Sequence, residues 1–245
     1  MIRFTMQLAG VNVGIDAMFE STRDFCKDYL CDAEPLFSVS VAMKDIEFER
    51  EKSAREDMLE GHPVQEYSDS YLEKLAVQRK ITEGLLEHDV LLFHGSVIAV
   101  DGQGYLFTAK SGTGKSTHTR LWRQHFGERA VMVNDDKPFL RISSGGVIAY
   151  GTPWMGKHGL GANVAVPLKA ICILNRDEEN RIERIAAKDV VLMLLQQSSR
   201  PRQPQQMVKY MELVDNLSAG VSFYRLWCNM NPDAAEIAYE GMLEN

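Results

Sequence analysis

A loop with phosphate-binding spacing is the clearest chemical feature of this sequence. The string Ala109-Lys110-Ser111-Gly112-Thr113-Gly114-Lys115-Ser116 has a small residue, four variable positions and then Gly-Lys-Ser. In such a loop the glycines let the backbone curl until its N–H groups point at phosphate oxygens, the lysine meets the β and γ phosphates, and the serine hydroxyl binds Mg²⁺. An apolar segment precedes the loop and a helical segment follows it, which is the context that this chemistry requires. We therefore predict that the loop binds the phosphates of a nucleotide.

Two adjacent carboxylates follow the next apolar segment. Asp135 and Asp136 come directly after a short strand predicted to begin at Ala130. An Asp-Asp pair is often only a solvated turn, but these two are among three acids between Gly102 and Arg176, a segment with ten Lys and Arg. One carboxylate would hold Mg²⁺, directly or through water, and the other would accept a proton from an attacking hydroxyl. The sequence leaves open which carboxylate does which.

A histidine is predicted to approach the loop from a neighbouring strand. The segment 91–100 is predicted as one strand that forms a hairpin with the strand before the loop. If Asp101 faces Gly104, the pairing brings His94 opposite Ser111 at the mouth of the loop. The imidazole would then contact a phosphate, the metal or the Asp pair. The alternative is that His94 is a structural residue of the strand.

A Gly-rich connection over 151–161 is predicted to be irregular and too polar for the core. Long loops of this kind often close over active sites. Lys157 is then a candidate to clamp the transferred phosphate, and Trp154 a candidate to cover the acceptor. A plain surface loop remains the alternative.

These assignments define one predicted site. The predicted catalytic residues are Asp135, Asp136, His94 and Lys115. The predicted cofactor-binding residues are Ser111, Gly112, Thr113, Gly114, Lys115, Ser116, Thr117 and Lys157, and the predicted metal ligands are Ser116 and Asp136. The expected cofactors are ATP, or a related nucleotide, and Mg²⁺.

The elements that must position these residues indicate an α/β fold in two parts. Residues 1–88 are predicted as a small N-terminal α+β lobe with a hairpin over 2–17 and two helices, and its expected role is scaffold or recognition. Residues 89–245 are predicted as the domain that carries the loop, with a helix from Lys115 to Phe126.

The motifs resemble the catalytic core of the HPr kinase/phosphorylase family and, more distantly, the phosphoenolpyruvate carboxykinases. The resemblance rests on three strings in the same order, Phe93-His94-Gly95-Ser96, the loop and Val133-Asn134-Asp135-Asp136, and it covers residues 90–175. It implies a mixed-sheet core, with Lys115 and Ser116 on nucleotide and metal and with the Asp pair and His94 in catalysis. The Gly-rich signature that follows the Asp pair in that family is not recognisable here. The chain therefore looks like the divergent relatives that phosphorylate free serine or modified peptides.

The composition of the chain argues against some classes of binding partner. The formal net charge of −7 argues against a nucleic-acid partner, since that class usually presents a basic face. We find no apolar run long enough for a membrane span and no signal peptide at the start, so we expect no membrane partner and a cytoplasmic location. The expected partners are the nucleotide and a hydroxyl-bearing small molecule, peptide or protein, and a homo-oligomer is possible.

The sequence supports three hypotheses about function. The first is a Mg²⁺- and nucleotide-dependent kinase that transfers a phosphoryl group to a hydroxyl. The second is a non-catalytic protein that binds ATP to regulate its interactions. The third is a phosphotransferase that uses pyrophosphate or ADP, because no group of residues identifies an adenine pocket.

Overall fold

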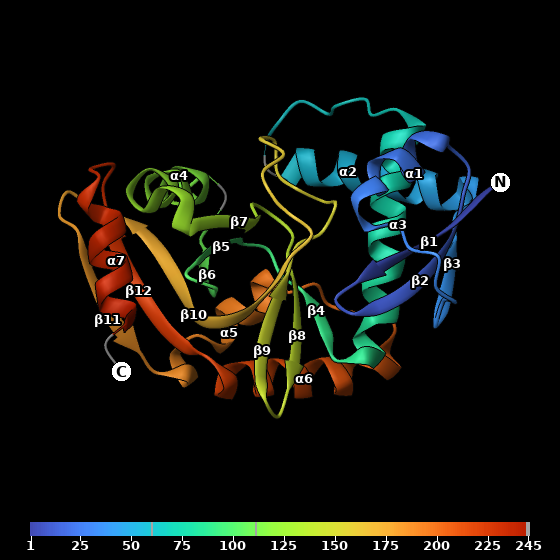
Figure 1. Cartoon of the computed structure of the whole chain (residues 1–245). Helices are drawn as coiled ribbons and strands as arrows, with labels where there is room; N and C mark the ends of the chain where they lie inside the picture. The colour runs from blue at the N-terminus through green and yellow to red at the C-terminus, as the bar shows by residue number, and fades with distance from the viewer. Residues whose placement is uncertain (60, 111, 244–245) are drawn as a thin grey trace. The chain divides into compact units, whose positions relative to one another are not determined.

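The computed structural model describes residues 1–59, 61–110 and 112–243. The chain divides into two compact units, Met1–His88 and Asp89–Asn245, which we call the N-terminal and C-terminal units (Figure 1). Among the described residues, we find no helix with both the length and the apolar character that a membrane crossing requires.

The N-terminal unit combines a small sheet with helices. Strand β1 (Ile2–Leu8) pairs antiparallel with β2 (Val11–Ala17), and β3 (Phe37–Ser40) pairs parallel with β2. The predicted hairpin is therefore confirmed, and its two turn residues both have positive φ, 50° at Ala9 and 75° at Gly10. The helices are α1 (Glu20–Phe25), α2 (Met43–Leu59) and α3 (Asp69–Leu85), with 3₁₀ turns η1 (Lys27–Tyr29) and η2 (Leu86–His88).

Buried acids organise the N-terminal unit around α3. Glu73 is fully buried and accepts hydrogen bonds from the backbone N–H groups of Met18 and Phe19, at 2.5 and 3.1 Å. Arg79 donates to the buried Glu49 of α2 at 2.5 Å. Since a buried charge is tolerated only when it is paired and hydrogen-bonded, these contacts fix how α2 and the start of α1 sit on α3.

The C-terminal unit is built on a branched mixed sheet. Its strands are β4 (Val90–Leu92), β5 (Ser96–Val100), β6 (Gln103–Thr108), β7 (Ala130–Asn134), β8 (Phe139–Ser143), β9 (Gly146–Tyr150), β10 (Ala165–Arg176), β11 (Arg181–Ile185) and β12 (Ser222–Cys228). The long strand β10 is the branch point: it pairs antiparallel with β9 near its start and parallel with β6 and β12 further along. The mixed sheet agrees with the prediction at the level of an α/β fold with parallel and antiparallel pairs.

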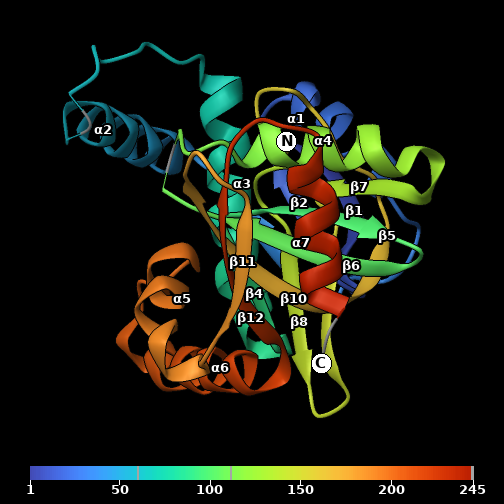
Figure 2. The ribbon, with the colours of Figure 1, turned by 90° about the vertical axis from the view of Figure 1, so that its left-hand side faces the viewer.

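Helices cover both faces of this sheet. They are α4 (Lys115–Phe126), α5 (Val191–Gln197), α6 (Met207–Gly220) and α7 (Asp233–Leu243), with 3₁₀ turns η3 (Gly127–Arg129), η4 (Ala187–Asp189) and η5 (Pro204–Gln206). Figure 2 shows α5 and α6 on the opposite side of β10 and β12 from α7. The predicted helix from Lys115 to Phe126 is confirmed.

An aromatic core fixes α4 on the sheet. Trp122 of α4 is fully buried, and its ring centroid lies 5.0 Å from that of Tyr105, 5.1 Å from that of Phe107 and 5.8 Å from that of Tyr239 on α7. Because aromatic side chains bury large apolar areas in fixed geometries, this cluster holds the helix that follows the loop at a defined height above β6.

The predicted strand over 91–100 is wrong as a single element. It is two strands, β4 and β5, that belong to different branches of the sheet and are separated by Phe93, His94 and Gly95. Apolar residues continue through the break, so hydrophobic pattern alone did not reveal it.

The predicted hairpin register is also wrong. Asp101 and Gly102 form a two-residue turn with φ of 51° and 79°, and Val100 faces Gln103. Ser96 therefore faces Phe107 and not residue 109, which shifts the predicted pairing by two residues. The prediction placed Asp101 opposite Gly104, with Gly102 and Gln103 between them, but Asp tolerates left-handed backbone and itself suits the tight turn of a hairpin.

A buried histidine in α4 predicts how stability changes with pH. His118 is 2% exposed, its Nε2 accepts from Trp122 Nε1 at 3.0 Å, and burial lowers its pKa to about 3. The unfolded chain binds a proton near pH 6.5 while the folded chain does not, so this site lowers stability as pH falls from about 6.5 toward 3. At pH 5 we expect a loss of about 2 kcal/mol relative to pH 8 that His118→Gln does not show.

Denaturant unfolding of the wild type and His118→Gln at both pH values measures this difference. Groups other than His118 titrate in both proteins, so their contributions cancel in the comparison. An equal pH dependence in the two proteins would contradict the assignment of a neutral, buried His118.

Candidate functional site

The loop between β6 and α4 contains two glycines with positive φ. Gly112 and Gly114 have φ of 74° and 122°, a region in which a side chain is strained, and Gly114 is the N-cap of α4. Ser116 and Thr117, both predicted to bind the cofactor, lie half-buried in the first turn of this helix. Ser111, also predicted there, lies outside the described residues.

The lysine of the loop is folded back onto it. Lys115 is half-buried, and its Nζ lies 3.4 Å from the carbonyl oxygen of Ala109 at the start of the loop. Burial lowers the pKa of Lys115, and the opposing influence of Asp136 is smaller. A partly desolvated ammonium within the curl of a loop is a strong partner for a phosphate oxygen, because charge-assisted hydrogen bonds gain strength where water is excluded.

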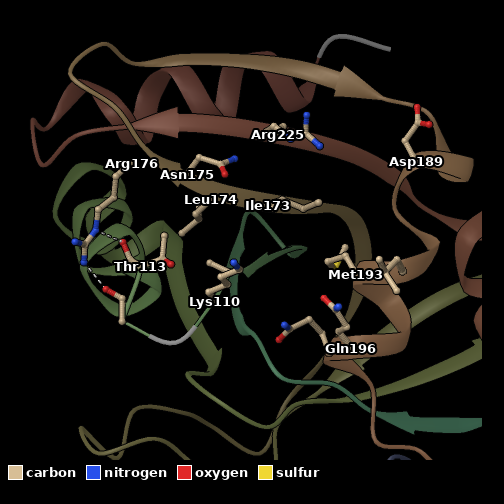
Figure 3. Close-up of a pocket in the computed structure, with 14 residues that line it drawn as sticks. Lys110, Thr113, Ile173, Leu174, Asn175, Arg176, Asp189, Met193, Gln196 and Arg225 are labelled. Carbon is tan, nitrogen blue, oxygen red and sulfur yellow. Dashed lines mark hydrogen bonds between the residues drawn. The ribbon is translucent and has the colours of Figure 1, made fainter. Parts of the chain in front are cut away.

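An arginine that the sequence analysis missed secures the loop to the sheet. Arg176, at the end of β10, donates from Nε to the carbonyl oxygen of Thr113 at 3.1 Å and from a terminal nitrogen to that of Gly112 (Figure 3). Each peptide group is planar and trans, so a fixed carbonyl also fixes the next N–H in the opposite direction. The signal available in the sequence was the position of Arg176 at the carboxyl end of a buried strand, where α/β sheets place their ligand sites.

The Asp pair is held in place by a buried asparagine. Asn134 Oδ1 accepts from the backbone N–H of Asp136 at 2.9 Å and of Lys137 at 2.6 Å. Its Nδ2 donates to the carbonyl and hydroxyl oxygens of Thr152, at 3.1 and 3.0 Å. These bonds tie the end of β7 to the connection that follows β9. The turn that carries the two carboxylates is therefore rigid, unlike a solvated Asp-Asp turn.

Asp136 is the more acidic of the two carboxylates. Its Oδ1 lies 3.3 Å from His94 Nε2 and its Oδ2 lies 4.0 Å from Lys137 Nζ. Burial acts to raise the pKa of Asp136, but the hydrogen bond with His94 and the charges of Lys137 and Lys115 together lower it below the ordinary value. Asp136 is therefore an ionised carboxylate among cations, the state in which it can bind a metal ion.

Asp135 lies in a different environment. It is 5% exposed, and its Oδ1 accepts from the backbone N–H of Gly156 at 2.6 Å. Burial raises the pKa of Asp135 above its ordinary value, against the opposing effect of N–H groups at Gly156 and Leu160. Adjacent carboxylates with pKa values moved in opposite directions can divide the roles of proton acceptor and metal ligand between them.

His94 is positioned by its backbone at the crossing between β4 and β5. Its N–H donates to the carbonyl oxygen of Gln197 at 2.7 Å, and its carbonyl oxygen accepts from Thr108 Oγ1 at 3.0 Å. The N–H of Gly95 donates to the backbone carbonyl of Asp136 at 3.0 Å. The predicted proximity of His94 to the Asp pair is thus found, although the register from which it was predicted is wrong.

The connection over 151–161 is only partly a surface loop. Thr152 is fully buried and Trp154 is 5% exposed, so the prediction that the whole segment is too polar for the core is wrong for its first residues. A Cβ at Gly151 would lie 1.8 Å from the carbonyl oxygen of Ala162, which explains the glycine by close backbone approach. Lys157 is exposed and follows Gly156, the residue that donates to Asp135.

The residues present fit a magnesium nucleotide. Within the described part of the chain no group of three His, Cys, Asp or Glu forms a ready-made metal site. Mg²⁺ does not need one, because it is commonly bound by one or two carboxylates together with substrate phosphates and water. Asp136 and the hydroxyl of Ser116 are oxygen groups of the kind that this mode uses, and the positive φ of Gly112 and Gly114 allows the backbone to curl as phosphate loops do.

The contact between His94 and Asp136 predicts the effect of removing the imidazole. His94→Ala should raise the pKa of Asp136, because the hydrogen bond that lowers it is lost. We expect weaker binding of Mg²⁺ with nucleotide, with a loss that grows as pH falls, and a change in unfolding free energy of about 1 kcal/mol or less. Calorimetric binding across pH and denaturant unfolding measure the two effects. A large stability loss with unchanged binding would mean that His94 is structural.

Comparison with known proteins gives a family for the chain. Among solved structures, the Hpr(Ser) kinase/phosphatase from Coxiella burnetii is 13% identical, with 50% of this chain and 86% of that chain covered and a TM-score of 0.30, too low to define a shared fold. A search of curated proteins found no match. The sequence model described as SynChlorMet cassette protein ScmC matches residues 70–231, well over half of the chain. The chain therefore belongs to the SynChlorMet cassette protein ScmC family.

Proposed function

We propose that this protein is a Mg²⁺- and nucleotide-dependent phosphotransferase that transfers the terminal phosphoryl group of ATP, or a related nucleotide, to a hydroxyl of a small molecule, a peptide or a protein. The observation that carries the proposal is the convergence of His94, Asp136 and Lys115 from three separate segments at one end of the sheet. The order of motifs that the chain shares with HPr kinases supports it.

The loop and its lysine would bind the phosphates of the donor. Lys115 would neutralise charge on the β and γ oxygens, and Arg176 would keep the loop curled by holding its carbonyls. Bound Mg²⁺, held by Ser116 and Asp136, would supply further positive charge to the same oxygens. Transfer of a phosphoryl group needs mainly such positioning and charge neutralisation.

Asp135 would act as the general base. Its raised pKa brings the carboxylate nearer to the range in which it can accept a proton at neutral pH. As the acceptor oxygen bonds to the γ phosphorus, the bond from phosphorus to the leaving nucleotide breaks and the hydroxyl proton passes to Asp135. His94 would hold Asp136 ionised and oriented and would not itself exchange the proton.

A nucleotide-responsive binding protein without turnover is the second candidate. The geometry of Asp135 favours it, since this carboxylate is 5% exposed and already accepts a backbone hydrogen bond at 2.6 Å. A base in that state reaches an acceptor only if the segment around Gly156 moves. Tight nucleotide binding with no transfer to any acceptor would support this candidate over the first.

Incubation with ATP labelled at the γ phosphate and Mg²⁺ tests the proposal. Free serine, hydroxylated metabolites, peptides and a lysate are offered as acceptors, and mass spectrometry identifies the phosphorylated product. We expect label in an acceptor with the wild type and at least about 10²-fold less with Asp135→Asn. Equal labelling by the two proteins would exclude Asp135 as the base, and tight ATP binding with no labelling by the wild type would favour the binding protein.

A further inference from the structure

The residue that follows the Asp pair, Lys137, is held by its backbone on both sides. Its N–H donates to Asn134 Oδ1 at 2.6 Å, and its carbonyl oxygen accepts from Thr152 Oγ1 at 2.8 Å. Asn134 and Thr152 are both fully buried. The next residue is Pro138, and a proline restricts the residue before it to extended backbone. The backbone of Lys137 therefore has a fixed position beside the two carboxylates.

The ammonium group of Lys137 is close to Asp136 but is not hydrogen-bonded to it. The distance from Lys137 Nζ to Asp136 Oδ2 is 4.0 Å, which is within ion-pair range and too long for a hydrogen bond. Within the described residues, this nitrogen has no other partner. The side chain is 31% exposed, so its charge is partly withdrawn from water. Three N–H donors are therefore available to a ligand that approaches Asp136.

Two lysines from separate segments converge on Asp136. Lys115 begins α4 and Lys137 follows β7, and the charges of both act on Asp136. The charge of Lys137 also lowers the pKa of Lys115, so the two ammonium groups lie within electrostatic range of each other. Asp135 accepts instead from the backbone N–H of Gly156. Around Asp136, two like charges thus face one carboxylate, an arrangement that an anionic ligand would stabilise.

The terminal phosphoryl group of the donor is the anion that the proposed reaction brings to this position. The loop and Lys115 would bind the donor's phosphates, and Asp136 would hold the metal ion that bridges the last two of them. During transfer, negative charge spreads over the three equatorial oxygens of the terminal group. A second lysine beside Asp136 supplies a further cation to these oxygens.

We propose that Lys137 is a catalytic residue that donates a hydrogen bond to the terminal phosphoryl group of the donor from the side of the Asp pair. The inference rests on the proposed function, because it assumes that the donor's phosphates lie on the loop. Lys137 keeps its proton throughout and supplies charge, so the bonds that form and break are those of the transfer already described. A consequence is that this side chain distinguishes a nucleoside triphosphate from a diphosphate.

Calorimetric binding of ATP and ADP at saturating Mg²⁺ tests the proposal. Lys137→Met removes the charge and keeps an apolar stem. We expect this variant to lose about tenfold or more in affinity for ATP and less than about twofold for ADP. Lys137→Arg keeps a cation and should retain most of the ATP affinity. Lys188→Met, at an exposed lysine of η4, is the matched control and should change neither affinity.

The same substitution in an Asp136→Asn background separates direct contact from an effect through Asp136. If Lys137 acts only by pairing with this carboxylate, Lys137→Met should change ATP affinity little once the carboxylate is neutral. We expect the double variant still to bind ATP about tenfold more weakly than Asp136→Asn does. Disappearance of the loss in this background would overturn the inference.

Two other outcomes would also remove Lys137 from the site. Equal losses for ATP and ADP in Lys137→Met would indicate a general effect of charge or structure. A loss specific to ATP in Lys157→Ala, with none in Lys137→Met, would give the contact to Lys157. If the expected affinities are found but no acceptor is phosphorylated, Lys137 stands as a ligand of the terminal phosphate and the proposed transfer fails.

Discussion

Replacing Lys115 with Ala is expected to lower phosphoryl transfer by about 10²-fold or more and to weaken nucleotide binding. The side chain is half-buried and its ammonium lies at the curl of the loop, 3.4 Å from the carbonyl oxygen of Ala109. The backbone N–H groups of a loop offset phosphate charge only in part, so loss of this cation leaves the transferred group under-neutralised. Single-turnover rates and calorimetric affinities measure the two effects.

Two lysines serve as comparisons for this variant. Lys44→Ala removes an exposed lysine of the N-terminal unit and should change neither rate nor affinity. Lys157→Ala removes an exposed lysine next to Gly156 and tests the predicted phosphate clamp separately. If Lys115→Ala matches the wild type in rate and affinity, the loop is not a phosphate site and the proposed function is lost with it.

Asp135→Asn and Asp136→Asn are expected to fail in different ways. Asp135→Asn removes the proton acceptor, so the rate should fall by about 10²- to 10⁴-fold with nucleotide affinity nearly unchanged. Asp136→Asn removes the ionised carboxylate, so the Mg²⁺ concentration needed for half-maximal rate should rise. Rates measured across Mg²⁺ concentrations, at saturating nucleotide, separate the two behaviours.

The opposite pattern has a clear meaning. A raised Mg²⁺ requirement in Asp135→Asn together with a simple rate loss in Asp136→Asn would exchange the two assignments. Full transfer by both variants would remove the Asp pair from catalysis and would favour a binding protein. The pKa directions make the first pattern the expected one, because a metal ligand must be ionised and a base benefits from a raised pKa.

The sequence was sufficient to predict the elements that depend on neighbouring residues alone. The helix from Lys115 to Phe126 is found, because an apolar face and a Gly stop define it without reference to distant residues. The hairpin of β1 and β2 is found because its two strands and the turn between them are also adjacent in the sequence. Elements whose position depends on the branch of the sheet were harder to predict. The break between β4 and β5 at Phe93–Gly95 leaves no trace in the hydrophobic pattern.

The residues of the candidate site show the same contrast between local features, which the sequence reveals, and long-range pairing, which it does not. The spacing of the loop identified Lys115, and the acids in a basic segment identified Asp135 and Asp136. Arg176 was missed because it reaches the loop only through the parallel pairing of β6 with β10, two strands about 60 residues apart in sequence. The strand β11 was missed as well, since its alternation of charged and apolar residues is short.

The anchoring of Thr152 to Asn134 has a consequence for how members of this family can vary in length. Thr152 Oγ1 also donates to the carbonyl oxygen of Lys137 at 2.8 Å. The segments before and after the β8–β9 hairpin are therefore hydrogen-bonded to each other next to the Asp pair. Everything between is the β8–β9 hairpin, whose tip at Ser143–Gly145 is exposed. Insertions at an exposed tip with fixed ends cost little closure entropy. This hairpin is therefore a place where homologues can gain or lose residues, or where a tag can be grafted, without disturbing the carboxylates.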